Sequence, residues 1–170
     1  MNARMMLVIA ALAVSQGTAG AADNSSPEYA QHFGAFEALT IAVANTMPAD
    51  QYPFRPHSES MTFGEVMGHI AATNYQFCAS LIDAPPPPEA SPTPTLKEPI
   101  VKFLQDSFNY CTPILRRLGE EQLKAKHNSP DGNLTGREVL LALYIHVAHH
   151  RGQAEIYLRD KGIRPPQYRI

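Results

Sequence analysis

A proline-dense segment between two helical patterns is the feature that most restricts how this chain can fold. Residues 84–95 read APPPPEASPTPT, which predicts a stiff, polyproline-like connection instead of a tight turn. At about 3.1 Å per residue the segment reaches roughly 37 Å, whereas the helix predicted before it is about 33 Å long. The connection can therefore return along that whole helix, so that the helices on either side of it run parallel.

Apolar residues recur at three- and four-residue steps in four segments, as is typical of amphipathic helices. We expect these helices at residues 27–47, 62–83, 95–119 and 135–161. The last three each begin with a threonine followed three residues later by a glutamate, which is the spacing of a capping box. These pairs are Thr62 with Glu65, Thr95 with Glu98, and Thr135 with Glu138. Residues 127–133 (HNSPDGN) predict a turn-rich connection, and we find no alternating strand pattern, so the fold class is all-α.

Three histidines fall where two of these helices would bring them together. His146 and His150 are four residues apart, so a helix stacks both imidazoles on one face. His69 interrupts an apolar helical pattern, where a buried imidazole needs a partner; taken alone, it would also fit a hydrogen-bonded core position. About 21 Å of helix follows His69, while His146 and His150 lie about 17 and 23 Å into the last helix. Antiparallel second and fourth helices would place all three at one level.

The two cysteines support the same arrangement. Cys78 and Cys111 each lie about 24 Å from the start of their helices, so parallel second and third helices would bring them level. After export a single disulfide is expected, whereas in a cytosolic protein the two would be buried thiols. The proline connection, the cysteines and the histidines together favour a four-helix bundle in up-down-down-up order.

Three neutral imidazoles form a donor set that suits zinc, nickel, copper or iron better than calcium or magnesium. They leave a coordination position open, as catalytic sites do and closed structural zinc sites do not. Such an ion could lower the pKa of a bound water or thiol, or polarise a carbonyl. We therefore predict that His69, His146 and His150 bind a divalent transition metal such as zinc, nickel or iron.

For the other polar residues of these helices, the argument for a role in the site is weaker. The helical metalloprotease motif has a glutamate directly after its first histidine, where this chain has Val147, so a peptidase is not supported. Glu65 is better explained as a helix cap than as a base. Gln153 could face the site, Arg151 could clamp a carboxylate or lie on the surface, and His149 lies behind the ligands or on the surface. The remaining histidines have no assigned role: His32, His57 and His127.

The first 21 residues have the pattern of a secretory signal peptide. Arg4 precedes an apolar run at residues 5–14, and small residues follow just before Ala22. The run is too short for a membrane anchor, so we expect a mature domain of residues 22–170 in the periplasm or secreted; an uncleaved helix is the alternative. The net charge is −2 and no cluster of Lys and Arg interleaves with aromatics, so nucleic-acid binding is not supported.

Three segments of the chain resemble the DinB family, also called DinB/YfiT-like metalloenzymes. They are YPFRP at residues 52–56, TFGEVMGHIA at 62–71 and HVAHHRGQAEIYLRDKGIRPP at 146–166. The resemblance implies an up-down-down-up four-helix bundle with a divalent metal held at His69, His146 and His150. Members of that family include transferases and isomerases that use low-molecular-weight thiols. Predicted export sets this chain apart, because cytosolic thiol cofactors are scarcer outside the cytoplasm.

The functional prediction is an exported metal-dependent enzyme that acts on an unidentified small molecule as a hydrolase or a thiol-type transferase. A non-catalytic metal-binding or stress-related bundle is the alternative. A homodimer formed through an exposed apolar helix face is compatible with either.

Overall fold

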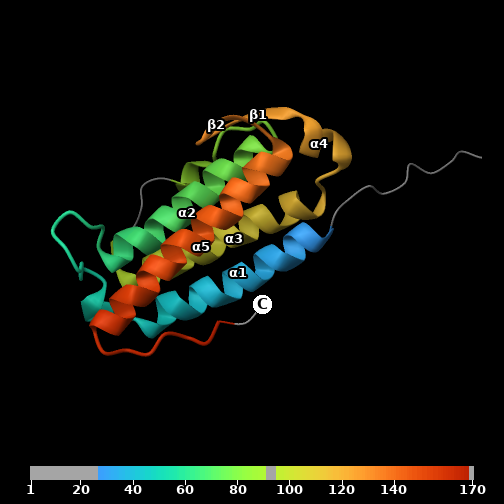
Figure 1. Cartoon of the computed structure of the whole chain (residues 1–170). Helices are drawn as coiled ribbons and strands as arrows, with labels where there is room; N and C mark the ends of the chain where they lie inside the picture. Colours follow the sequence, from blue (N-terminus) through green and yellow to red (C-terminus); the bar gives the residue numbers. More distant parts are fainter. Residues whose placement is uncertain (1–26, 91–94, 169–170) are drawn as a thin grey trace, which may run out of the picture.

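The computed structural model describes residues 27–90 and 95–168, which are mainly helical (Figure 1). The four long helices are α1 (Pro27–Thr46), α2 (Phe63–Ser80), α3 (Lys97–Arg116) and α5 (Gly136–Asp160). The short elements are η1 (Ala49–Gln51), η2 (Pro88–Ala90), α4 (Glu120–Lys124), β1 (Lys126–Ser129) and β2 (Gly132–Thr135). None of the helices in the described ranges is long and apolar enough to cross a membrane. The predicted signal peptide, residues 1–21, lies outside the described residues.

The long helices form a bundle in which α2 and α3 run in the same direction and α1 and α5 run in the opposite one (Figure 1). Both α2 and α1 pack against α3 on one side and α5 on the other. Fully buried aromatic side chains fill the centre; the Phe33 ring of α1, for example, lies 4.9 Å from the Phe108 ring of α3. The predicted four-helix bundle in up-down-down-up order is confirmed.

Two contacts between α2 and α3 show that these helices are parallel. Cys78 and Cys111 form a disulfide with 5.4 Å between their Cα atoms and a sequence separation of 33. One turn earlier on both helices, Asn74 Nδ2 donates a 3.1 Å hydrogen bond to Ser107 Oγ, again across 33 residues. The offset stays constant along the pair only because the helices run the same way. The single disulfide that we expected between Cys78 and Cys111 is present.

Side-chain caps mark the starts of α2 and α5, as predicted. Thr62 Oγ1 accepts a hydrogen bond from the Glu65 backbone N–H, and the Glu65 carboxylate accepts one from the Thr62 N–H. Thr135 and Glu138 form the same reciprocal pair at the start of α5. Each box satisfies two backbone donors that a helix start would otherwise leave unpaired.

The third predicted capping box, Thr95 with Glu98, is wrong. The N-cap of α3 is Leu96, which makes no side-chain cap bond, and the first helical hydrogen bond runs from Ile100 N to Leu96 O. Pro99 explains the shift, because a helix capped by Thr95 would need the Pro99 nitrogen to donate that first bond, and proline has no N–H. With Leu96 as the cap, Pro99 falls in the first turn, where no donor is required.

The connection between α3 and α5 adds a short hairpin that the sequence analysis did not predict to the all-α bundle. Residues 120–124 form α4, and β1 and β2 form an antiparallel hairpin that pairs Lys126 with Thr135 and Ser129 with Gly132. Gly132 has a φ of 111°, which suits the turn because glycine alone adopts this conformation without strain. The strands were missed because four residues are too few to show a clear alternation, although the turn itself was predicted.

His127, which the sequence left unassigned, joins the hairpin to the rest of the bundle. Its side chain is only 2% exposed, with Nδ1 3.0 Å from Asp83 Oδ1 and Nε2 2.8 Å from the Gln122 carbonyl oxygen. Both partners are acceptors, so the ring makes both bonds only when it is protonated. Burial lowers the His127 pKa, but the bonds to Gln122 and Asp83 outweigh burial and raise it overall.

Replacing His127 with glutamine should therefore destabilise the protein most at acidic pH. The folded-state pKa lies above the ordinary 6.5, so the stabilisation is complete below about pH 6.5 and falls as pH rises through the folded-state pKa. Urea unfolding at about pH 5.5 and about pH 8.5 should show a larger difference between wild type and variant at the lower pH. His57→Gln, a change at an exposed histidine, is the control. A difference that does not vary with pH would contradict a charged His127.

Candidate metal site

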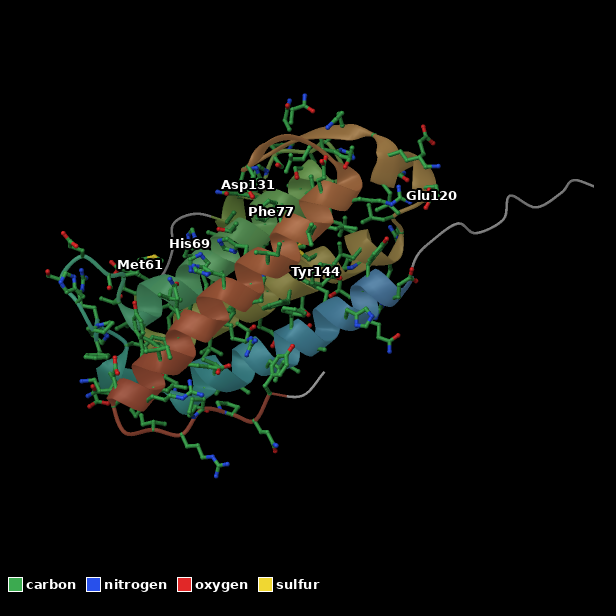
Figure 2. The ribbon with its side chains drawn as sticks, viewed as in Figure 1. Met61, His69, Phe77, Glu120, Asp131 and Tyr144 are labelled. Atoms are coloured by element: carbon green, nitrogen blue, oxygen red, sulfur yellow. A yellow bond between two sulfur atoms is a disulfide. The ribbon has the colours of Figure 1, made fainter. Side chains whose placement is uncertain are left out.

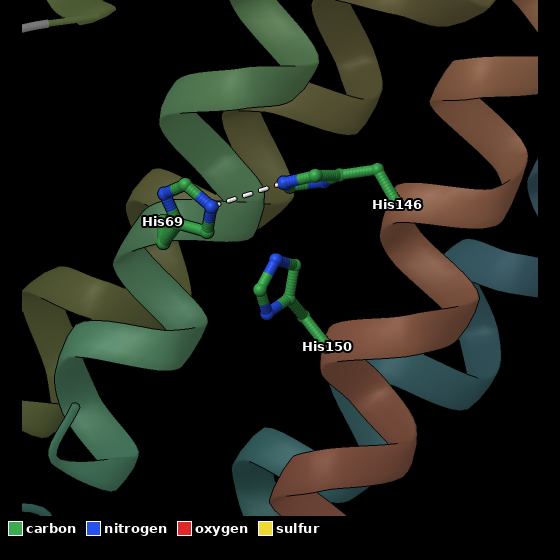
Figure 3. A group of neighbouring side chains, drawn as sticks. All are labelled: His69, His146 and His150. Atoms are coloured by element: carbon green, nitrogen blue, oxygen red, sulfur yellow. Dashed lines mark hydrogen bonds between the residues drawn. The ribbon is translucent and has the colours of Figure 1, made fainter. Parts of the chain in front are cut away.

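Two antiparallel helices bring the three predicted ligands together (Figure 3). His69 lies on α2, while His146 and His150 lie one turn apart on α5. Their rings point toward one another across the space between the two helices. The common level predicted from helix lengths is therefore correct.

The ring nitrogens of the triad are close enough to share one ion. His69 Nε2 lies 3.0 Å from His146 Nε2, and one ligand nitrogen from each histidine lies within 4.8 Å of the others. A tetrahedral ion with bonds of about 2.0–2.1 Å separates its nitrogen ligands by roughly 3.3 Å. Small side-chain rotations would thus suffice to place all three nitrogens around a zinc-sized ion.

The surroundings of the triad favour neutral imidazoles. Burial, and then the neighbouring histidines His150, His69 and His149, lower the pKa of His146 to about 3. Burial also lowers the pKa of His69 and of His150, although the bond to Gln153 partly opposes this at His150. A neutral imidazole keeps the lone pair that a metal ion needs, so these rings do not have to lose a proton before binding one near neutral pH.

Gln153 orients one of the ligands. Its Oε1 lies 2.7 Å from His150 Nδ1 and can only accept, so Nδ1 carries the proton and donates it. This leaves the lone pair on Nε2, the nitrogen available to the site. A partner that fixes the tautomer in this way is a regular feature of histidines that bind metals. Gln153 therefore contacts the triad through His150.

His146 is held differently. Its Nδ1 is buried and has no hydrogen-bond partner within the described part of the chain, and its ring meets the Phe77 ring edge at 6.0 Å. Aromatic packing therefore directs the His146 ring, and His69 Nε2 is the polar partner that faces its other nitrogen. Three neutral ring nitrogens thus converge, and the buried Nδ1 of His146 has no partner among the described residues. This arrangement fits a divalent transition metal better than a hydrogen-bonded core cluster.

The other polar residues considered from the sequence lie outside the triad. Glu65 caps α2 and lies 3.5 Å from Arg55. Arg151 is buried, forms an ion pair with Glu155 and stacks its guanidinium 5.0 Å from the centre of the Tyr168 ring. It thus clamps a carboxylate of its own helix. Among the described residues the cluster consists of these three histidines and contains no carboxylate.

A groove beside the triad was not predicted from the sequence. It is lined by His146, by exposed His149 and by residues from the start of α5 and the hairpin tip. The hairpin was not expected, so nothing pointed to Asp131 as a neighbour of the histidines. The one available signal was that Leu141 and Ile145 lie off the buried stripe of α5 and are nevertheless apolar.

Comparisons with known proteins agree with this fold. The model of the DinB superfamily matches residues 32–154. The chain is 28% identical over 144 residues to YjoA, an uncharacterized protein of Bacillus subtilis, with 81% of this chain and 91% of that protein covered.

Two solved structures have the same architecture. The crystal structure of YjoA, a DinB-like protein, has a TM-score of 0.72 at 25% identity and covers 84% of this chain and 98% of its own. A DinB-like protein from Bacillus cereus has a TM-score of 0.73 at 16% identity, with 86% and 99% covered. At that lower identity the likeness concerns the fold alone.

Proposed function

Because this chain belongs to the DinB superfamily, we propose that it is an exported metal-dependent enzyme that acts on a small molecule. His69, His146 and His150 would hold one divalent transition metal such as zinc, nickel or iron. The observation that carries this proposal is the convergence of three neutral imidazole nitrogens within 4.8 Å of one another. Export is supported by the Cys78–Cys111 disulfide, because such bonds persist in oxidising compartments.

The residues around the triad support two reaction classes, hydrolysis and thiol-type transfer. When bound, the ion would supply Lewis acidity, which lowers the pKa of a coordinated water or thiol and polarises a carbonyl. His69 is the most accessible of the three ligands, so the triad is open to solvent. Gln153 would keep the His150 lone pair directed at the ion. The described cluster contains no carboxylate, so neither class could use an acidic base within it.

Metal analysis of protein purified without added metal tests the proposal. Wild type should contain about one ion per chain. The His146→Ala variant should bind the ion more than about 100-fold more weakly, which is a larger loss of affinity than is found for residues that only orient a ligand. Gln153→Leu, which removes the acceptor for His150, should lose roughly 10- to 100-fold. His32→Ala is the control, because His32 is exposed and lies on α1. Wild type that binds no zinc, nickel or iron after reconstitution would overturn the metal site.

A non-catalytic metal-binding or stress-related bundle is the second candidate, and the lack of a carboxylate in the described cluster is what favours it. The two candidates differ in their response to a chelator. A structural or sensing ion should raise the melting temperature without turnover of any substrate. An enzyme should lose turnover on metal removal and regain it when the ion is restored.

A further inference from the structure

A groove of about 400 Å³ lies between the hairpin tip and the outer side of α5. One end is formed by His146 and His149, the other by Asp131 and Glu138, and Leu141 and Ile145 lie between them. Figure 2 shows Asp131 at the hairpin end of the bundle and His69 on α2, farther from the hairpin. The groove thus leads from the hairpin toward the histidine triad.

The middle of the groove is apolar and open to solvent. Leu141 and Ile145 lie one turn apart on the same face of α5 and are 60% and 58% exposed. Isolated exposed apolar residues are ordinary on a protein surface. Leu141 and Ile145, however, are neighbours and line a groove that ends at a candidate metal ligand. A groove with apolar walls and few polar groups is typical of a small-molecule site.

The hairpin end of the groove carries one free negative charge. The Glu138 carboxylate caps α5 and lies 3.5 Å from Lys126 Nζ, so its charge is already balanced. The Asp131 carboxylate makes no hydrogen bond or ion pair among the described residues. A ligand that extends along the groove would therefore meet an unbalanced carboxylate at the end farthest from the triad. This charge favours a cationic group on the ligand.

We propose that this groove is the substrate-binding site and that it takes an elongated molecule with a cationic end, such as a primary ammonium. The ammonium pairs with Asp131, the apolar body lies on Leu141 and Ile145, and the other end reaches the ion held by the triad. This inference rests on the proposed metal-dependent function and adds the class of substrate. Asp131 and Ile145 are binding residues here and have no part in holding the metal.

Binding of hydroxamates to zinc-loaded protein tests the proposal, because a hydroxamate group coordinates zinc directly. Acetohydroxamate reports on the metal site alone. Three longer hydroxamates of equal chain length, which end in an ammonium, a methyl or a carboxylate group, report on the groove. Titration calorimetry gives each dissociation constant, and zinc content is measured for every variant.

In wild type the ammonium compound should bind about fivefold more tightly than the methyl compound, and the carboxylate compound most weakly. Asp131→Asn should abolish this order, while Asp160→Asn, at the far end of α5, should keep it. Ile145→Ser should weaken all three long compounds roughly tenfold and leave acetohydroxamate unchanged. Ile156→Ser, at another exposed isoleucine of α5 outside the groove, is its control.

Failure of the groove and failure of the metal site give different results. Tight acetohydroxamate binding with no gain from a longer chain, or with no preference for the ammonium end, would overturn the groove and leave the metal site intact. Absence of zinc, nickel and iron binding, together with absence of acetohydroxamate binding, would overturn the proposed function and the groove with it. Sedimentation that shows a stable dimer, lost in Ile145→Ser and kept in Ile156→Ser, would assign this face to a second copy of the chain and also overturn the groove.

Discussion

Reduction of the Cys78–Cys111 disulfide is expected to lower the free energy of unfolding by roughly 4 kcal/mol. The bond joins residues 33 apart in sequence, and the proline-rich connection lies within the loop that it closes. Closing this loop restricts the unfolded chain, and the stabilisation grows with loop length. Both cysteine side chains are fully buried, so the thiols stay packed after reduction and no cavity opens. Most of the effect should therefore come from the unfolded state.

Urea unfolding of oxidised and reduced protein measures this effect. With a slope of about 2 kcal/mol per molar urea, the midpoint should fall by roughly 2 M on reduction. The double variant Cys78→Ala with Cys111→Ala is the control, because its midpoint should not respond to the reductant. Equal midpoints for oxidised protein and for protein whose thiols are shown by mass spectrometry to be free would contradict the prediction.

The change Gly136→Ala should destabilise the protein by roughly 3 kcal/mol or more. Gly136 opens α5 directly against α4. A Cβ atom there would lie 2.3 Å from the Gln122 carbonyl oxygen and 2.9 Å from the Leu123 Cα. Both are backbone atoms, so a side-chain rotation cannot relieve the contact. Either α4 moves away or α5 starts later, and both responses also disturb the bond from Gly136 N to Ala125 O.

Gly152→Ala is the matched control, since it makes the same substitution in the same helix. A Cβ at Gly152 has nothing within 4 Å. Alanine favours the helix more than glycine does, so this variant should be more stable than wild type by up to about 1 kcal/mol. The two variants should therefore shift the urea midpoint in opposite directions. A Gly136→Ala protein that unfolds at the same urea concentration as Gly152→Ala would show that α4 does not pack as described.

Much of the bundle could be predicted because its signals are local. The caps at Thr62 and Thr135 depend on spacings within a single turn, which the sequence states directly. The level of His69 with His146 and His150 follows from residue counts along straight helices, once the length of the proline connection favours parallel α2 and α3. Cys78 and Cys111 fit the same register, which the constant offset of 33 between α2 and α3 confirms.

The features that were missed depend on partners distant in sequence or on competition between two local signals. At the start of α3 the Thr95 and Glu98 pattern competed with Pro99, and the missing N–H of proline decided the outcome. His127 was passed over because its partner Asp83 is 44 residues away. The strands β1 and β2 are too short to show a pattern of their own.

The sequence by itself determined the four long helices, their order in the bundle, the cysteine pair and which three histidines come together. Each of these follows from periodicity, spacing or the reach of a segment, which are properties of one stretch of chain. Only the tertiary structure decided that Gln153 sets the tautomer of His150, that His127 is buried between two acceptors, and that Asp131 faces a groove beside His146. These features arise where separate segments meet, and their distances and burial depend on how side chains pack, which no single stretch of sequence specifies.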